Sequence, residues 1–234
     1  MPGADAGPGL TALRVLLAAD LLARVAELSG LQVLTAAAAD DPAAGPAAAL
    51  ERDAGALGIH PPTARTTSRD APSSLGGPID LHLVTRDALD PRLDGLRAVV
   101  GAAYLSRPGG QAAAAGGSLP AGPGRDPLAV RLALMSFPIS LAAGVTGDAL
   151  DRAGETIGSW RRQVARWAES PSRPIPAPTA EAARAAFGSL DTASALALLR
   201  GLAPDAGVPA GAKFETFVFA DRVLGLDLAR EVGR

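Results

Sequence analysis

A stretch rich in glycine and proline, from Arg107 to Gly124, constrains the fold more than any other feature of this sequence. It includes Pro108-Gly109-Gly110 and shows no hydrophobic periodicity, so we expect a linker there. The patterns on its two sides differ, because strand-like and helical segments alternate before it and only helical segments follow it. We therefore predict two domains, residues 1–124 and residues 125–234.

The first domain is predicted to be α/β. Apolar residues recur at three- and four-residue steps from Thr11 to Gly30, which predicts an amphipathic helix. The further elements that we expect are a strand at Leu31–Leu34, a helix at Ala47–Leu57, a loop at Thr63–Pro78, and strands at Ile79–Val84 and Leu96–Tyr104.

The second domain is predicted to be a helical bundle. Asp126-Pro127 combines a helix N-cap with a proline at the first helical position, so a helix is expected from there to about Leu134. Further helices are expected at Thr146–Ala168, from Thr179 onward, after the cap Asp191, and at Phe214–Val232.

Composition excludes several classes of chemistry. The chain has no cysteine, so disulfides, thiolate nucleophiles and cysteine-ligated metals are impossible, and it has two histidines and one lysine, Lys213. The net charge of −2 does not support nucleic acid as a partner, although a local basic face could still meet tRNA. No apolar run reaches the ~18–20 residues of a membrane span, and Met1–Gly9 lacks the pattern of a signal peptide. We expect a cytoplasmic protein without a membrane partner.

Several motifs occur in an order that resembles one enzyme family. Asp20–Val33 is similar to the helix and strand that follow the His-Ile-Gly-His signature of cysteinyl-tRNA synthetases and of the related ligase that joins cysteine to the mycothiol precursor. The other similar segments are Leu57–Pro62, Asp80-Leu81-His82 with Asp87 and Pro91, Asp126–Ser136, Trp160-Arg161-Arg162 and Leu190–Leu196. The resemblance implies an incomplete, class I synthetase-type Rossmann-like domain in residues 1–124, followed by the helical bundle.

The sequence departs from this family at its chemical groups. The first signature falls on Gly9–Ala12, which has no imidazole, and Gly116–Gly124 has no lysine where the family's lysine-rich signature would lie. Leu83-Val84-Thr85 replaces the family's three glycines, and Arg92 and Leu93 replace its paired histidines. Because the family's zinc ligands include cysteine, which this chain lacks, we expect no metal. Because both phosphate-binding signatures are missing, we also expect no cofactor and no catalytic residue.

The resemblance leaves one remnant of an adenylate pocket. It comprises His82, Asp80 and Asp87, which we consider as cofactor-binding residues. The structural alternative for His82 is a strand-end histidine bonded to a backbone carbonyl, and for the two aspartates it is a solvated loop. Asp40-Asp41 aligns loosely with a further family motif and is equally well explained as a helix cap.

Two other groups have structural alternatives. Trp160 and Trp167 are seven residues apart and are interpreted as core anchors rather than base-stacking groups. The arginines that could meet tRNA phosphate are Arg152, Arg161, Arg162 and Arg166. We favour the alternative that these arginines form a solvated face paired with Asp148, Asp151 and Glu155.

Three functions remain open. We favour a non-catalytic paralogue of the cysteine-activating enzymes, a pseudoenzyme that binds an unidentified protein or small molecule and that could form a homodimer. The second hypothesis is an ATP-dependent cysteine ligase that binds phosphate through arginines, for which the candidates are Arg65, Arg69, Arg86 and Arg92. The third is a helical interaction module in residues 125–234.

Overall fold

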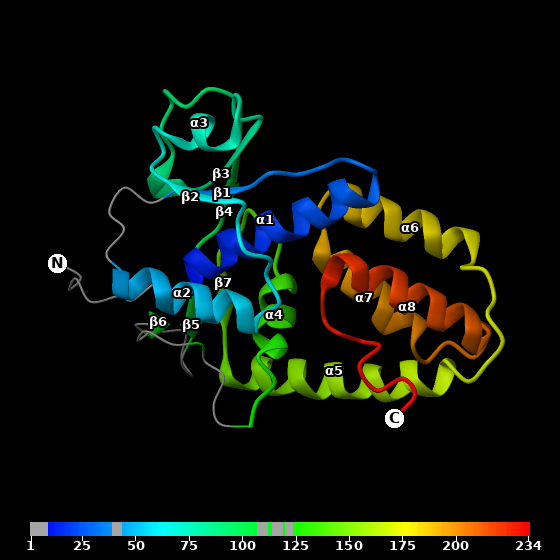
Figure 1. Cartoon of the computed structure of the whole chain (residues 1–234). Coiled ribbons are helices and arrows are strands. Elements are labelled where there is room, and N and C mark those ends of the chain that lie inside the picture. The colour runs from blue at the N-terminus through cyan, green and yellow to red at the C-terminus, as the bar shows by residue number, and fades with distance from the viewer. Residues whose placement is uncertain (1–8, 39–43, 107–111, 114–118, 120–123) are drawn as a thin grey trace. The chain divides into compact units, whose positions relative to one another are not determined.

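The computed structural model describes residues 9–38, 44–106, 112–113, 119 and 124–234. The protein is mixed α/β, with eight α-helices and small, mainly parallel sheets in these residues. The chain forms two compact units (Figure 1). Unit 1 contains residues 1–120 and 139–147, and unit 2 contains residues 121–138 and 148–234.

Unit 1 holds the strands that the structure describes. Its helices are α1 (Leu10–Leu28), α2 (Ala44–Ala56), α3 (Ala71–Leu75) and the 3-10 turn η1 (Arg86–Ala88). Its strands are β1 (Ala36–Ala38), β2 (Ala64–Thr66), β3 (Leu81–Thr85), β4 (Leu96–Val100), β5 (Ala103–Ser106), β6 (Ala112–Ala113) and β7 (Ala143–Val145). The pairs β1–β2, β3–β4 and β5–β7 are parallel, whereas β5–β6 is antiparallel.

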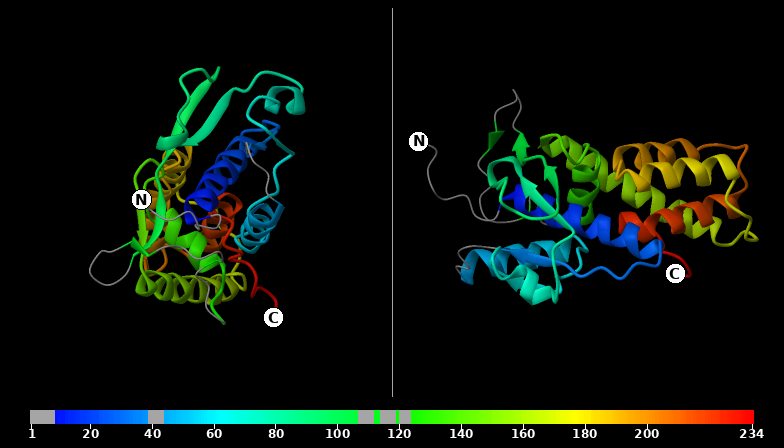
Figure 2. Two further views of the ribbon diagram at one scale, coloured as in Figure 1. Left: turned by 90° about the vertical axis from the view of Figure 1, so that its left-hand side faces the viewer. Right: turned by 90° about the horizontal axis from the view of Figure 1, so that it is seen from above.

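Helix α1 supplies the apolar centre of unit 1. Its buried leucines follow the predicted spacing, and they are Leu10, Leu13, Leu17 and Leu21. The helix packs against α2, β3, β4 and β5. In both views of Figure 2, α1 lies close to the green strands of this unit. The predicted helix from Thr11 to Gly30 is therefore confirmed.

Unit 2 is a bundle of helices. They are α4 (Leu128–Met135), α5 (Gly147–Trp167, of which Gly147 belongs to unit 1), α6 (Ala177–Gly188), α7 (Thr192–Leu202) and α8 (Ala210–Leu224). Phe217 of α8 is fully buried, and the rings of Trp160 and Trp167 on α5 meet its ring edge at centroid distances of 5.5 and 5.1 Å. Both tryptophans are core anchors, as the sequence indicates.

Helix starts are the best predicted features of unit 2. The Asp126 carboxylate accepts the Leu128 N–H at 2.9 Å where α4 begins, and Asp191 accepts the Ser194 N–H at 3.0 Å where α7 begins. Helix α6 begins at Ala177, two residues before the predicted Thr179. Helix α8 begins at Ala210, four residues before the predicted Phe214. It does not continue to Val232, because the chain turns at Gly225, whose φ is +60°.

Several predictions about strands are wrong. The first strand forms at Ala36–Ala38 rather than at Leu31–Leu34, because that register lets β1 pair with β2, with Ala36 opposite Ala64. The predicted loop at Thr63–Pro78 contains β2 and α3. The predicted strand at Leu96–Tyr104 is two strands, β4 and β5, that are separated at Gly101.

The division into two units also differs from the predicted domain boundary between residues 124 and 125. Strand β7 follows α4 in sequence but pairs with β5, with Ala103 opposite Ala143, so residues 139–147 return to unit 1. The segment after Arg125 is consequently not helical throughout. Most of the predicted linker at 107–124 lies outside the described residues.

In the part of the chain that the structure describes, no helix is long and apolar enough to cross a membrane.

Candidate functional site

The segment that the family resemblance aligns with the first signature forms the first turn of α1. Thr11 uses its hydroxyl twice: Oγ1 accepts the Ala103 N–H at 3.0 Å and donates to the Ala103 carbonyl oxygen at 3.1 Å. This reciprocal pair joins α1 to the start of β5, whose Ala103 is buried. The Thr11 hydroxyl is therefore committed to packing the helix on the strand.

Arg14, one turn further along α1, continues this attachment. It is only 2 % exposed, and its Nη1 donates to the carbonyl oxygens of Gly101 at 3.0 Å and Ala102 at 3.2 Å, and also to that of Leu141. Burial lowers the pKa of Arg14. The side chain thus holds the β4–β5 junction and the segment before β7 to one face of α1. The signal in the sequence is an arginine on the leucine-rich face of an amphipathic helix.

The C-terminal half of α1 binds the connection after α2. Asp20 is buried, and its Oδ1 accepts the backbone N–H of His60 at 3.1 Å and lies 3.1 Å from His60 Nδ1. Arg24 donates from Nε to Asp20 Oδ2 at 2.9 Å and from Nη2 to the Gly58 carbonyl at 3.0 Å. His60 itself is exposed.

His82, the central residue of the predicted pocket, lies on β3 and is half-buried. Its Nε2 donates to the Asp94 carbonyl oxygen at 2.7 Å. Its register partner on β4, Arg97, donates from Nη1 to the Asp90 carbonyl at 3.2 Å. Both side chains therefore hold the backbone that connects β3 with β4. This is the arrangement expected from the structural alternative for His82.

Asp80 and Asp87 lie at opposite ends of β3. Asp80 precedes the strand and Asp87 lies in η1 after it, and both are exposed. Neither carboxylate makes a hydrogen bond or an ion pair within the described residues. Across the same residues, no group of three histidine, aspartate or glutamate side chains could hold a metal ion. A cofactor-binding role of His82, Asp80 and Asp87 stays a prediction.

The candidate phosphate-binding arginines are distributed over several elements of unit 1. Arg65 on β2 forms an ion pair with Glu51 of α2 at 2.8 Å. Arg86 begins η1, whereas Arg69 and Arg92 lie in connections, and all three are exposed. Lys213, the single lysine, lies in unit 2, where its Nζ donates to the Ala203 carbonyl at 2.9 Å and is 5.4 Å from the centroid of the Trp167 ring. It is therefore a structural residue of the bundle.

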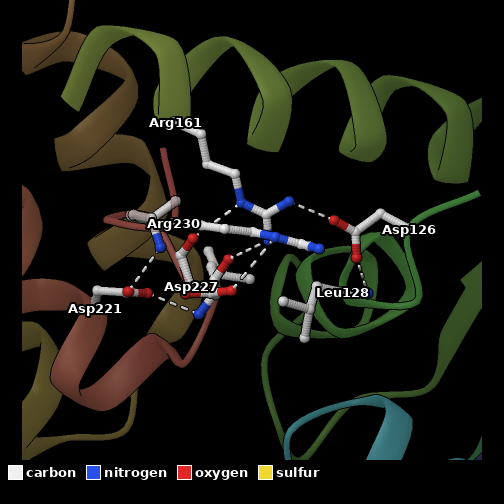
Figure 3. A network of polar contacts seen from close by, with 8 residues as sticks. Asp126, Leu128, Arg161, Asp221, Asp227 and Arg230 are labelled. Atoms are coloured by element: carbon white, nitrogen blue, oxygen red, sulfur yellow. Dashed lines mark hydrogen bonds and ion pairs between the residues drawn. The ribbon is translucent and has the colours of Figure 1, made fainter. Parts of the chain in front are cut away.

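The prediction of a solvated arginine face on α5 is correct for Arg152, Arg162 and Arg166 and wrong for Arg161. Arg161 is buried and forms an ion pair with Asp126 (Figure 3). The burial of Arg161 could not be predicted from the family motif or the helical pattern, because Arg161 donates to the carbonyl oxygens of Leu226 and Asp227, which are distant in sequence. The predicted pairing of this face with Asp151 is also wrong, because Asp151 pairs with Arg125.

Asp126 combines two structural tasks. Its Oδ1 caps α4 through Leu128, and its Oδ2 accepts from Arg161 Nη1. Partial burial by itself would raise the pKa of Asp126. The hydrogen bonds from Arg161 and Leu128 and the charges of Arg161 and Arg230 outweigh burial, so the pKa of Asp126 is lowered. The Asp40-Asp41 pair lies outside the described residues.

No family model and no curated protein matches this chain. In both units, buried charged side chains bind backbone groups, as Arg14, Asp20, Arg161 and Lys213 do.

Proposed function

We propose that this chain is a non-catalytic paralogue of the cysteine-activating class I synthetases and ligases, which acts by binding another molecule. In this proposal unit 1 is an incomplete, Rossmann-like domain of that class and unit 2 is its helical bundle. The parallel strand pairs of unit 1 and the cap at Asp126 support this assignment. The ordered motifs of the sequence are its other support.

The observation that carries the proposal is the use of Thr11. Where the resemblance places two phosphate-facing histidines, at Gly9 and Ala12, the chain has no imidazole. The hydroxyl between these positions is bonded in both directions to Ala103. A hydroxyl that is bonded in this way stabilises the packing of α1 on β5 instead of donating a proton to a reacting phosphate.

The missing groups favour a non-catalytic protein over a slow enzyme. A single donor that stabilises charge in a transition state is worth about 2.7–4 kcal/mol, so the loss of several donors reduces a rate by many orders of magnitude. Among the candidate cations, Arg65 pairs with Glu51, and Lys213 binds a backbone carbonyl in the bundle. We therefore favour the non-catalytic function over the arginine-based ligase.

The test is an ATP–pyrophosphate exchange assay of the full chain with cysteine and with every other standard amino acid. A working cysteinyl-tRNA synthetase measured in parallel is the positive control. We expect exchange at the level of a protein-free reaction for every amino acid. Amino-acid-dependent exchange would overturn the proposal. Its loss in Arg86→Ala or Arg92→Ala would then assign phosphate binding to those arginines.

A further inference from the structure

The parallel pair β3–β4 is only partly covered by the rest of unit 1. All five residues of β3 are half-buried, and Leu96, where β4 begins, is 72 % exposed. Helix α1 packs against both strands, but no described strand pairs with the second edge of β3, because β1 and β2 form a sheet of their own. Parallel sheets are normally buried on both faces, and an unpaired edge readily accepts another strand. This edge of β3 is therefore a candidate interface.

The register of the ladder shows which backbone groups face this free edge. Leu81 lies opposite Leu96, and the Leu96 N–H donates to the Asp80 carbonyl oxygen at 2.9 Å. In a parallel ladder, a residue that faces the partner strand bonds to the two neighbours of the residue opposite it. The backbone groups of Leu96 therefore face β3, whereas those of Leu81 point away from β4. Because the direction alternates along a strand, the backbone groups of Leu83 and Thr85 also face the free edge.

Two exposed charges of opposite sign flank the same edge. Asp80 directly precedes β3 and Arg86 directly follows it, and neither side chain forms an ion pair within the described residues. When two copies of one strand pair antiparallel about a two-fold axis, the start of each strand meets the end of the other. An axis centred on Leu83 places Asp80 of each copy opposite Arg86 of the other. The edge is therefore complementary to itself in charge as well as in hydrogen bonding.

The register centred on Leu83 fits better than the registers next to it. It pairs every residue of β3, and the outward backbone groups of Leu83 meet those of Leu83 in the second copy. Sliding one strand by two residues places Arg86 opposite His82 in one direction and Asp80 opposite Val84 in the other, so both ion pairs are lost. Sliding by one residue sets outward backbone groups against inward ones, which cannot bond.

We propose that two copies of this chain associate through the free edges of their β3 strands, paired antiparallel about Leu83. The result is a continuous four-stranded sheet, in which β4 and β3 of one copy are followed by β3 and β4 of the other. The partner is a second copy rather than a foreign peptide, because β3 and its two flanking charges supply their own complement in length, charge and backbone direction. This inference does not depend on the proposed function.

The two flanking charges are tested by measuring the dimer dissociation constant of the full chain by analytical ultracentrifugation. Asp80→Arg and Arg86→Asp each set like charges opposite one another, so each should raise this constant about tenfold. The double variant Asp80→Arg/Arg86→Asp restores opposite charges and should return the constant to about the value of the parent chain. Glu155→Arg on α5, an exposed residue, changes the net charge as Asp80→Arg does and should have no effect. A parent chain that stays monomeric, or a double variant no tighter than the single ones, would overturn the proposal.

The register is tested by disulfide cross-linking, because the chain has no cysteine of its own. Leu83→Cys places a thiol opposite its equivalent in the second copy, where the two Cα atoms of a bonded antiparallel pair lie about 5.5 Å apart, a separation that a disulfide spans. We expect mild oxidation to convert Leu83→Cys into a covalent dimer. Leu96→Cys is the matched control: Leu96 is more exposed but lies on β4, away from the paired edge, so its thiol should cross-link only slowly, by collision. Cross-linking of Leu96→Cys that is as fast as that of Leu83→Cys would overturn the proposal.

Discussion

At the residue scale, Thr11 has the most specific role in unit 1. Replacing Thr11 by valine keeps the shape but leaves the N–H and C=O of Ala103 without their partner. We expect a loss of about 1–3 kcal/mol in the free energy of unfolding, measured by urea denaturation. Thr11→Ser retains the hydroxyl and should lose less than half of that. A loss in Thr11→Ser as large as that in Thr11→Val would show that the methyl group contributes as much as the hydrogen bonds, and a Thr11→Val variant as stable as the parent chain would contradict the role of the hydroxyl.

The ion pair between Asp126 and Arg161 gives a prediction about pH. Because folding lowers the pKa of Asp126, the pair contributes stability above the carboxyl's ordinary pKa, and this contribution is lost as the pH falls through the lowered value. Asp126→Asn should therefore cost about 1–3 kcal/mol near neutral pH and progressively less in acid. Urea denaturation at a series of pH values measures this.

Asp151→Asn provides the comparison for that series. Asp151 pairs with Arg125 at the surface, and its carboxylate side chain is 60 % exposed. Exposed pairs contribute about 0–1 kcal/mol, so this variant should follow the parent chain closely at every pH. If Asp126→Asn behaved in the same way, the buried pair would have no special role in unit 2.

At the element scale, the close approach of Gly101 to the segment before β7 positions β5. A Cβ atom at Gly101 would lie 2.1 Å from the Leu141 carbonyl oxygen, which is backbone and cannot rotate away. Gly101→Ala should therefore destabilise the protein by about 1–3 kcal/mol or more, as measured by thermal or urea unfolding.

Gly77→Ala is the matched control for Gly101→Ala. A Cβ atom at Gly77 meets nothing within 4 Å, and the backbone there does not need a positive φ. This substitution should be neutral or slightly stabilising, because alanine restricts the unfolded chain. A Gly101→Ala variant as stable as Gly77→Ala would contradict the described packing of residues 139–141.

The helices could be predicted from sequence because their signals are local. The leucine spacing of α1, the Asp126-Pro127 start of α4 and the Asp191 cap of α7 each lie within a few residues. The strands could not, because β1 is three alanines without alternation and β7 is defined by pairing with β5, about 40 residues earlier in the chain. Arg14 and Arg161 bind carbonyls that are 87 and 66 residues away in sequence, so local patterns could not assign them.

At the scale of the whole molecule, the return of residues 139–147 to unit 1 limits what the bundle can do alone. A fragment of residues 125–234 would keep the core around Phe217 but would carry β7 without β5. Ala143 and Val145 on β7 are fully buried in the intact chain. We expect the fragment to be helical by circular dichroism and to self-associate in sedimentation experiments.

Replacing residues 139–145 of that fragment by a glycine–serine linker should restore the monomer without loss of helix. Self-association that persists in this variant would show that another surface of the bundle is responsible. A fragment that is already monomeric would instead favour an autonomous helical module.

The central claim is that the first turn of α1 serves packing rather than chemistry. It is tested most directly by a single-turnover experiment with the chain in excess over labelled ATP, in the presence of cysteine. This detects one round of adenylate formation even when turnover is very slow. We predict that ATP remains intact to the extent seen without protein. Cysteine-dependent conversion of ATP into AMP or adenylate, in proportion to the amount of chain, would contradict the account.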